Sequence, residues 1–504
     1  MGQCSFDPPG EGSERCPRGT VDGREQCVFH LDPAEREPAG VSEPDLRAAF
    51  RADIRSGDDR RKELVGASFG DLDLSALVVD GPDLTGIRFR DVRVTGTLDL
   101  SGAIVGHPVT FEDCAIARLE FTDATVEKTA SIIDSTLGAP DTSRTSLTAR
   151  RSTFEGDLDV SNTELRGPAE FAACTVEGWF DVEGSTFGGR AHFPRVSLSM
   201  AQILDTRFEE AVEFADATVD HATLHAVRFA ERVDLSDAAF GTLRSTPTGD
   251  TTVNLRGATV SSGRLDQPDD GRALYDLTEA TVGDLDLDCT PSTFDRYRFY
   301  RTGFSGFPFA AYRDLLRANG WRIHDYLGDA PDDVEDLEIT YLKAKQGATS
   351  VGDNESAAAF FIREMEFRRG RYARHALDAE YATTHRAGAA VRWATNAFLG
   401  GLAGYGERPG RVLFAALVVI LGSGVAYPAL GGLDAGAGIV TYASDGVGAA
   451  LDGIYFSVVT FTTLGLGDVE PVGSLARLVV GTEALAGAFL TALFVFALGR
   501  SVTR

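Results

Sequence analysis

Lysine is nearly absent from this chain of 504 residues, and basic residues are outnumbered by acidic ones. With 75 acidic and 48 basic residues, the formal net charge is −27. A chain of this charge repels phosphate backbones, so we expect no nucleic-acid partner. Acidic surfaces with arginine in place of lysine are typical of proteins that work in concentrated salt, which predicts a halophilic protein. The only lysines are Lys62, Lys128, Lys343 and Lys345.

Long apolar runs are also lacking over most of the chain. The segment 1–40 contains none, so we expect no cleavable signal peptide. Uncharged or nearly uncharged runs long enough to cross a bilayer lie at Val412 to Leu430 and Leu478 to Leu498. Between them, residues 449–462 form an apolar segment with one charge, Asp452, which is too short to span and suits a re-entrant helix.

A glycine-rich motif follows this short segment. Gly465 and Gly467 alternate with leucines, and glycine permits the positive φ that turns successive carbonyls toward a common axis. Thr463 adds a hydroxyl oxygen at the inner end, and the carboxylate of Asp468 raises the local cation concentration at the outer mouth. The motif reads Thr462-Thr463-Leu464-Gly465-Leu466-Gly467-Asp468.

This motif resembles the selectivity filter of potassium channels, whose usual form is TTVGYGD. The order of outer helix, pore loop and inner helix is similar to the pore of two-transmembrane-helix (ion channel 2 type) potassium channels. The resemblance implies K⁺ as the permeant ion and a homotetramer, because each chain supplies one pore loop. Leu464 and Leu466 replace valine and tyrosine without removing a carbonyl, and Tyr455 falls where the family carries an aromatic residue that braces the filter.

Two residues of the inner helix have competing interpretations. Gly487 stands where the family has its hinge glycine, and it also suits close helix packing. Glu483 is an ionisable residue within the membrane, which indicates a function; we expect it to support the filter by hydrogen bonding behind it, with a pore-facing charge or a packing role as alternatives. In the family register Gly487 and Thr491 line the pore, and Val495 and Leu498 form an apolar ring that gates it.

The N-terminal segment carries three of the six cysteines. Cys4, Cys16, Cys27 and His30 are spaced C-x11-C-x10-C-x2-H. An odd number of cysteines beside a histidine indicates a tetrahedral zinc site rather than disulfides. The alternatives are free thiols in a disordered tail and a catalytic metal. A catalytic metal needs an open position for a substrate, whereas here protein residues would fill all four ligand positions. This segment has too few apolar residues to fold by burying them. We therefore expect loss of zinc to unfold residues 1–35 and no other part of the chain.

An apolar residue recurs at every fifth position over a long central region. This period fits neither a helix nor a plain strand, so it indicates internal repeats. It resembles the pentapeptide-repeat family, which implies a right-handed parallel β-helix with about 20 residues per coil. Breaks near residues 134–150 and 243–272, rich in Ser, Thr, Asp and Pro, suggest loops, and Cys114 and Cys174 suit small core positions. The series includes Phe69, Leu74, Val79, Leu84, Phe89, Val94, Phe111, Ile116, Phe121, Val126, Phe214, Val219, Leu224 and Phe229.

Helical patterns connect the repeats to the pore. Residues 335–348 and 354–375 predict a helical hairpin whose turn lies at Gly347 to Gly352, with Asp353 as an N-cap. A basic helix with a tryptophan, Arg386 to Leu402, favours a position on the membrane surface over a third soluble helix. Arg408, Arg411, Arg500 and Arg504 flank the spanning helices, whereas the loop between the outer helix and the pore helix is acidic, so both termini are expected in the cytoplasm.

The sequence therefore predicts a multidomain membrane protein with an N-terminal right-handed parallel β-helix, an α-helical linker and a C-terminal all-α two-helix pore with a re-entrant loop. We expect a multi-pass potassium or other cation channel of the cell membrane. A membrane-anchored scaffold with a vestigial pore is the alternative, and an enzyme is not expected, because no catalytic constellation is found. The predicted segments are a zinc knuckle (1–35), a helical cap (36–63), the pentapeptide β-helix (64–290), an aromatic cap and hairpin linker (291–380), an interfacial helix (381–410) and the pore (411–504).

Overall fold

The computed structural model describes residues 2–7, 15–79, 85–139, 144–324, 333–436 and 438–502. Leu84, which the repeat pattern includes, and Arg504 lie outside these residues. The chain divides into two compact units, Met1–Pro331 and Asp332–Arg504.

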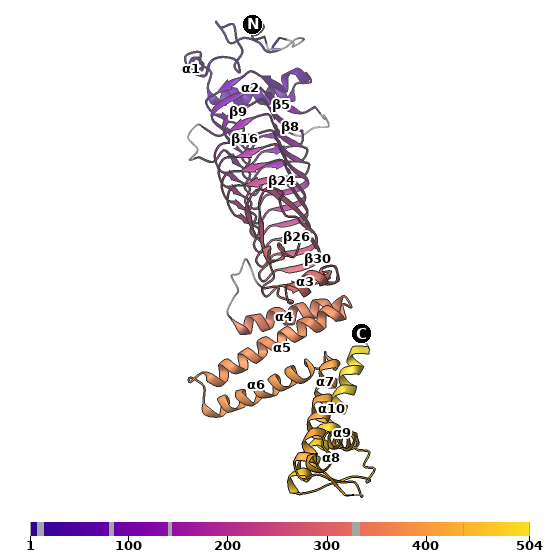
Figure 1. The fold of residues 1–504 in the computed structure, drawn as a ribbon. Coiled ribbons are helices and arrows are strands. Elements are labelled where there is room, and N and C mark those ends of the chain that lie inside the picture. Colours follow the sequence, from indigo (N-terminus) through magenta and orange to yellow (C-terminus); the bar gives the residue numbers. More distant parts are fainter. Residues whose placement is uncertain are drawn as a thin grey trace. The chain divides into compact units, whose positions relative to one another are not determined.

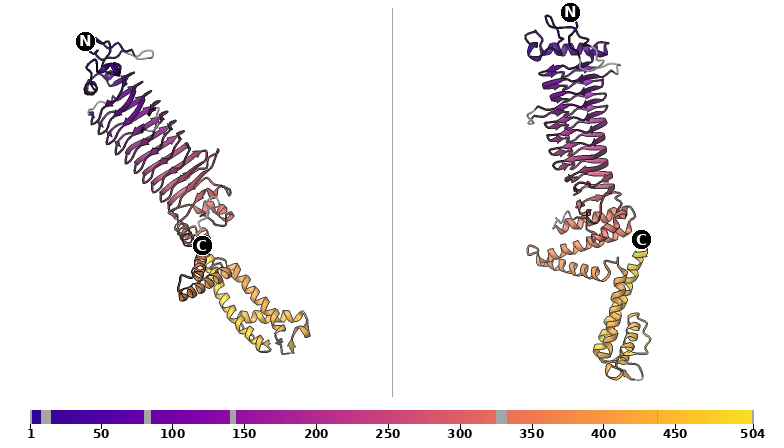
Figure 2. Two further views of the ribbon diagram at one scale, coloured as in Figure 1. Left: turned by 90° about the vertical axis from the view of Figure 1, so that its left-hand side faces the viewer. Right: turned by 45° about the horizontal axis from the view of Figure 1, so that its top comes forward.

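The first unit is a parallel β-solenoid of about 11 turns across residues 63–304. Its short strands stack coil upon coil (Figures 1 and 2), and the pairings between the described strands are parallel. Val109 in β8 (Val109–Glu112) pairs with Ile87 in β5 (Ile87–Arg90) on the preceding coil and with Ala130 in β11 (Ala130–Ile133) on the next. These steps along the chain are slightly longer than the coil that the repeat pattern implies.

The repeat positions point into the solenoid, as the period predicts. Phe69, Phe89 and Phe111 are 0–1 % exposed. Rings also stack between coils: the centroids of Phe193 and Phe214 are 4.4 Å apart with nearly parallel planes. Such offset or stacked rings add about 0.5–1.5 kcal/mol to their burial. The repeat therefore builds a continuous apolar axis.

The second predicted break in the repeats is wrong over most of its length. Strands β26 (Ala239–Thr248), β27 (Thr251–Asn254) and β28 (Thr259–Leu265) continue the solenoid through it. The backbone ladder does not depend on side-chain polarity, and threonine suits strands. Buried Asn254 is satisfied because its amide donates to Asp234 Oδ1 at 2.6 Å. The first break does hold an insertion, between β12 (Thr136–Leu137) and β13 (Leu147–Thr148).

Helix α2 (Glu43–Arg55) covers the first coils of the solenoid. Ser42 and Asp45 form a capping box at its start. Its buried face carries Phe50, whose ring centroid is 5.8 Å from that of Phe89. A short helix, α1 (Pro33–Arg36), precedes it.

At the other end, the solenoid extends past the predicted boundary at residue 290. Strands β31 (Tyr297–Arg298) and β32 (Gly303–Phe304) still pair in parallel with the preceding coil. The rings of Tyr275 and Tyr297 stack at 5.3 Å, so the aromatic segment first adds strands and then closes the end. The remaining elements there are η2 (Phe294–Arg296), η3 (Phe309–Tyr312) and α3 (Arg313–Ala318).

The second unit begins with a helical hairpin. In α4 (Val334–Ser350) and α5 (Asn354–Leu377) the rings of Tyr341 and Phe367 stack at 5.3 Å, and Asp353 caps α5 through the Ser356 amide. Gly347 is buried inside α4 rather than in the turn, because the helix continues to Ser350. Helix α6 (Thr383–Ala403) packs on α5.

The remaining helices have the predicted order. Pro409–Ala429 and Ser474–Arg500 are each long and apolar enough to cross a membrane. Gly424 and Gly453 allow close packing of outer and pore helices, since a Cβ on Gly453 would lie 2.1 Å from the Gly424 carbonyl oxygen. The elements are α7 (Pro409–Ala426), η4 (Tyr427–Ala429), β33 (Leu433–Asp434), β34 (Ile439–Val440), α8 (Tyr442–Asp445), α9 (Gly448–Phe461), β35 (Glu470–Pro471) and α10 (Ser474–Val502).

Candidate functional site

The glycine-rich motif leaves the C-terminal end of α9 as an irregular strand. Thr463, Gly465 and Gly467 have φ values of +57°, +59° and +74°. Residues with positive φ therefore alternate with residues that do not have it. This arrangement can turn consecutive carbonyls toward one side. The C-terminal end of α9, where its carbonyls are exposed, directs negative potential to the same place. This geometry suits a dehydrated cation.

A hydrogen bond ties this strand to the pore helix. The hydroxyl of Tyr455 donates to Asp468 Oδ2 at 2.6 Å, which supports the predicted bracing role. Its neighbour Phe456 packs edge-on against Tyr427, with ring centroids 5.0 Å apart. A hollow of about 350 Å³ lies between the strand, α9 and α10, and Leu466 lines it.

Glu483 is 3 % exposed and lies where α10 faces α9. One carboxyl oxygen contacts the Ser457 hydroxyl of α9, and the other contacts the Tyr427 hydroxyl of η4. The residue therefore holds the pore helix rather than hydrogen bonding to the filter strand itself. A pore-facing charge does not agree with this burial.

The predicted pore-lining residues fall into two groups. Gly487 is buried against α9, where a Cβ would lie 2.3 Å from the Phe461 carbonyl oxygen, which favours close packing over a hinge. Thr491, Val495 and Leu498 are exposed on the single chain. These three residues are therefore available to an axial pore.

The last turn of α10 lies beside the turn between α6 and α7. Arg500 Nη2 is 2.6 Å from Glu407 Oε1, and the Glu407 side chain is 2 % exposed. The Arg500 guanidinium also stands over the Phe361 ring of α5, 5.5 Å from its centroid, and the Lys345 ammonium of α4 is 5.3 Å from the same centroid. We call Lys345, Phe361, Glu407 and Arg500 the inner-end cluster.

Comparison with known families decides the nature of this unit. Residues 414–504 match the family model described as ion channel. The match covers most of α7 and all of α9, the glycine-rich strand and α10, so the C-terminal part of the chain is an ion channel domain. No curated protein and no solved structure matches the chain. The protein is thus a membrane protein in which a parallel β-solenoid and a helical region precede a two-helix channel domain.

The predicted metal ligands are brought together far from the channel domain in sequence. The ligand atoms of Cys4, Cys16, Cys27 and His30 all lie within 4.8 Å of one another. The Cys16 and Cys27 sulfurs are 3.9 Å apart, and His30 Nδ1 is 3.5 Å from Cys4 Sγ and 3.2 Å from Cys27 Sγ. Zinc–sulfur bonds of about 2.3 Å give tetrahedral edges of about 3.8 Å, so this set fits zinc.

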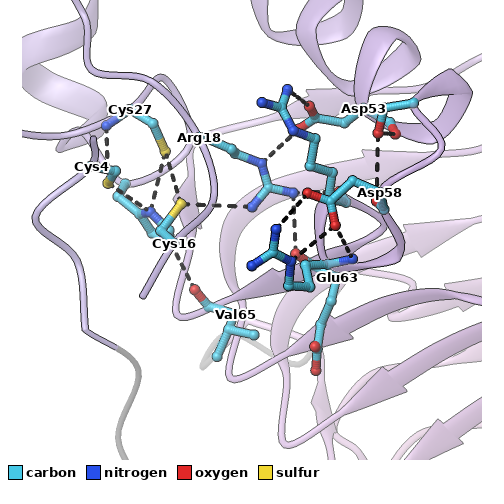
Figure 3. A network of polar contacts seen from close by, with 12 residues as sticks. Cys4, Cys16, Arg18, Cys27, Asp53, Asp58, Glu63 and Val65 are labelled. Carbon is cyan, nitrogen blue, oxygen red and sulfur yellow. Dashed lines mark hydrogen bonds and ion pairs between the residues drawn. The ribbon is translucent and has the colours of Figure 1, made fainter. Parts of the chain in front are cut away.

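The surroundings of the metal cluster also suit a metal (Figure 3). His30 Nε2 is 2.7 Å from the Val65 carbonyl oxygen and donates to it, which leaves the Nδ1 lone pair facing the thiols. Hydrogen bonding from the Cys27 thiol, aided by His30, lowers the pKa of Cys16 far below its usual value. Arg18 lies beside the cluster and donates to Asp53 Oδ2 at 2.6 Å.

Two cysteines of the solenoid, Cys114 and Cys174, behave differently. Burial raises the pKa of Cys114 to about 11 and that of Cys174 to about 12. Both thiols are therefore protonated near neutral pH and act as small core residues, as the repeat pattern predicts.

Sequence reasoning missed three of these residues. Tyr427 and Ser457 carry no motif, although each is a polar residue in or beside an apolar segment facing Glu483. Glu407 stands in a glycine-rich turn between two helices and resembles an ordinary exposed charge. Its only sequence signal is its position directly before the outer helix.

Proposed function

We propose that this protein is a potassium-selective channel made of four identical chains, and not an enzyme. The observation that carries the proposal is the alternation of positive φ at Thr463, Gly465 and Gly467 directly after the pore helix. A ring of carbonyls can replace the hydration shell of K⁺ only if several such strands surround one axis. One strand per chain requires four chains, as in the pores that this sequence resembles.

The exposed side chains of the channel domain support an assembly. Leu464 and Leu466 are 65 % and 61 % exposed on the single chain, and Val495 is 63 % exposed. Large exposed apolar surfaces mark contacts with other chains or with lipid. In the proposed tetramer the α10 helices surround the pore, and α7 faces the lipid.

Charge supports an orientation with the solenoid in the cytoplasm. Arg500 pairs with Glu407, so the last turn of α10 and the first of α7 lie at the same end of the unit, together with Arg408 and Arg411. The loop that leads to α9 carries Asp434 and Asp445 instead. Positive residues remain on the cytoplasmic side. Helix α6 would then lie on the inner membrane surface.

Exposed residues of α6 support this surface position. Val391, Trp393 and Phe398 are 66 %, 44 % and 55 % exposed, whereas Asn396 is buried. Its hydrogen bonds to Tyr405 and Met365 hold α6 in the unit on the side opposite Val391 and Phe398, and Trp393 lies at the edge of this buried side. An amphipathic helix with exposed aromatic side chains binds the boundary between headgroups and acyl chains.

For the N-terminal metal cluster we propose a structural zinc ion. Three cysteines and one histidine would close its coordination shell, which leaves no open position for a substrate. The bound ion would stabilise a segment that has few apolar residues of its own.

Ion flux tests the proposal. Full-length protein in liposomes should take up a radioactive rubidium tracer along a K⁺ gradient and not along a matched Na⁺ gradient, and the Gly467→Ala variant should not. Equal uptake with both gradients would exclude potassium selectivity. No uptake by a correctly assembled wild-type tetramer would exclude conduction and favour the scaffold.

A further inference from the structure

A buried cluster of oxygen atoms joins three helical elements behind the filter. Glu483 Oε2 contacts the Tyr427 hydroxyl, and its Oε1 contacts the Ser457 hydroxyl. Ser457 Oγ is in addition 2.8 Å from the carbonyl oxygen of Ile420 in α7. Tyr427 and Ser457 are both 0 % exposed, so water does not complete these contacts.

The three contacts need three protons. The Ile420 carbonyl can only accept, so the Ser457 hydroxyl must donate its single proton there. The Tyr427 proton serves Oε2. The contact between Oε1 and Ser457 Oγ then needs a third proton, which only the carboxyl group can provide. We propose that Glu483 is held as the neutral carboxylic acid, with a proton on Oε1 that it donates to Ser457.

The charges around the cluster agree with a neutral acid. Among the residues that the structure describes, no cation pairs with Glu483. Residues 412–426 of α7 carry no charge, and α9 carries Asp452 and Tyr455, of which the second already donates to Asp468. Besides Glu483, α10 has Arg477 and Arg500 as its only charged residues up to position 500. An ionised carboxylate would be buried without a counter-charge, which is strongly unfavourable.

The proton has a mechanical consequence, which rests on the proposed conduction. Loss of the proton would force Ser457 to donate to Glu483 and to release Ile420, so this hydrogen bond between the outer and pore helices would be lost. Ser457 lies about one and a half turns before the filter, and a displaced pore helix would misplace the filter carbonyls. Conduction should therefore fall in alkaline solution.

Replacement of Glu483 by glutamine tests whether Glu483 acts as a neutral acid or as a carboxylate. The amide of a Glu483→Gln variant can donate to Ser457 and accept from Tyr427, as the acid does. We expect this variant to conduct like the wild type and to lose the alkaline fall. Glu483→Ala should lose flux. If Glu483→Gln assembles as a tetramer but does not conduct while the wild type does, the neutral acid is excluded.

Infrared spectroscopy tests the protonation state without any flux. Purified full-length protein at neutral pH should show the C=O stretch of a protonated carboxyl group, and Glu483→Gln should remove it. Glu407→Gln is the matched control, because this buried carboxylate pairs with Arg500 and is expected to be ionised. No difference band between wild type and Glu483→Gln would overturn the inference, even if the protein conducts. If the protein does not conduct, the same band still tests the protonation state.

Discussion

Arg500 Nη2 lies 2.6 Å from Glu407 Oε1, which joins the last turn of the inner helix to the turn that precedes the outer helix. The Arg500 guanidinium also covers Phe361, so the α4–α5 hairpin contacts the inner helix directly. The inner-end cluster therefore joins the hairpin directly to the last turn of the inner helix.

We predict that this ion pair holds the inner helices apart at the ends that carry Arg500. Arg500→Gln removes the Arg500 cation from the buried Glu407 carboxylate and should lower both thermal stability and resting flux. Glu407→Gln should lower flux with a smaller loss of stability. The exchange Glu407→Arg with Arg500→Glu should recover part of the flux. Unchanged flux in both single variants would show that the pair does not affect gating.

The filter assignment predicts loss of conduction on adding one methyl group. In Gly465→Ala or Gly467→Ala no atom lies within 4 Å of the new Cβ in the single chain, so the cost comes from the positive φ, about 1–2 kcal/mol. The tetramer should assemble and should not conduct. Gly388→Ala is the matched control, because it also meets open space but lies in α6 with an ordinary φ. Normal flux from both filter variants would remove the assignment.

The apolar ring predicts the effect of a charge. Val495→Asp should hold the inner mouth wet and raise resting flux, because an apolar constriction closes by losing its water. Val495→Asn should act in the same direction to a smaller extent. Liposome flux measures both, with tetramer assembly checked by size-exclusion chromatography. If neither variant changes flux, the gate lies elsewhere, for example in the filter.

Removal of zinc should destabilise more of the chain than the residues 1–35 that the sequence suggested. His30 donates to the Val65 carbonyl, and Arg36 donates to that of Ser68 at 2.5 Å, so the metal segment is bonded to the first coil. A chelator should therefore raise hydrogen exchange in β1 (Glu63–Val65) and β2 (Ser68–Phe69) as well as in residues 15–35, while later coils stay protected. Cys16→Ala should reproduce this change.

Cys289→Ser serves as the control for that experiment, since Cys289 lies outside the metal cluster. The variant should keep the metal and the exchange pattern of the wild type. Metal analysis that finds no zinc in the purified protein would remove the prediction. Exchange that rises only before residue 35 would restore the narrower expectation.

The sequence predicted the architecture well because both halves rest on short-range patterns. The five-residue period marks inward positions such as Phe89 and Phe111, and an apolar run marks each spanning helix. The metal ligands could be found because cysteine and histidine in a polar segment have few other uses. Polar coils near residues 243–265 were mistaken for loops, because strand pairing there depends on backbone bonds to neighbouring coils.

What the sequence could not show is which side chains meet across helices. Gly487 satisfies a hinge and a packing role equally until its distance to Phe461 is known. Glu483 was recognised as functional, but its partners Ser457 and Tyr427 lie 26 and 56 residues away. Contacts of this kind depend on helix rotation and crossing, which a periodic pattern leaves open.

Where successive coils have the same length, one whole coil can be removed from the solenoid. Val109 and Ala130 occupy equivalent places in successive coils, so removing the segment 109–129 would join matching strands without shifting any inward position. Each such deletion shortens the rod by one strand spacing, about 4.8 Å. The distance between the cysteine-rich end and the aromatic end can thus change in fixed steps while the pore sequence stays untouched.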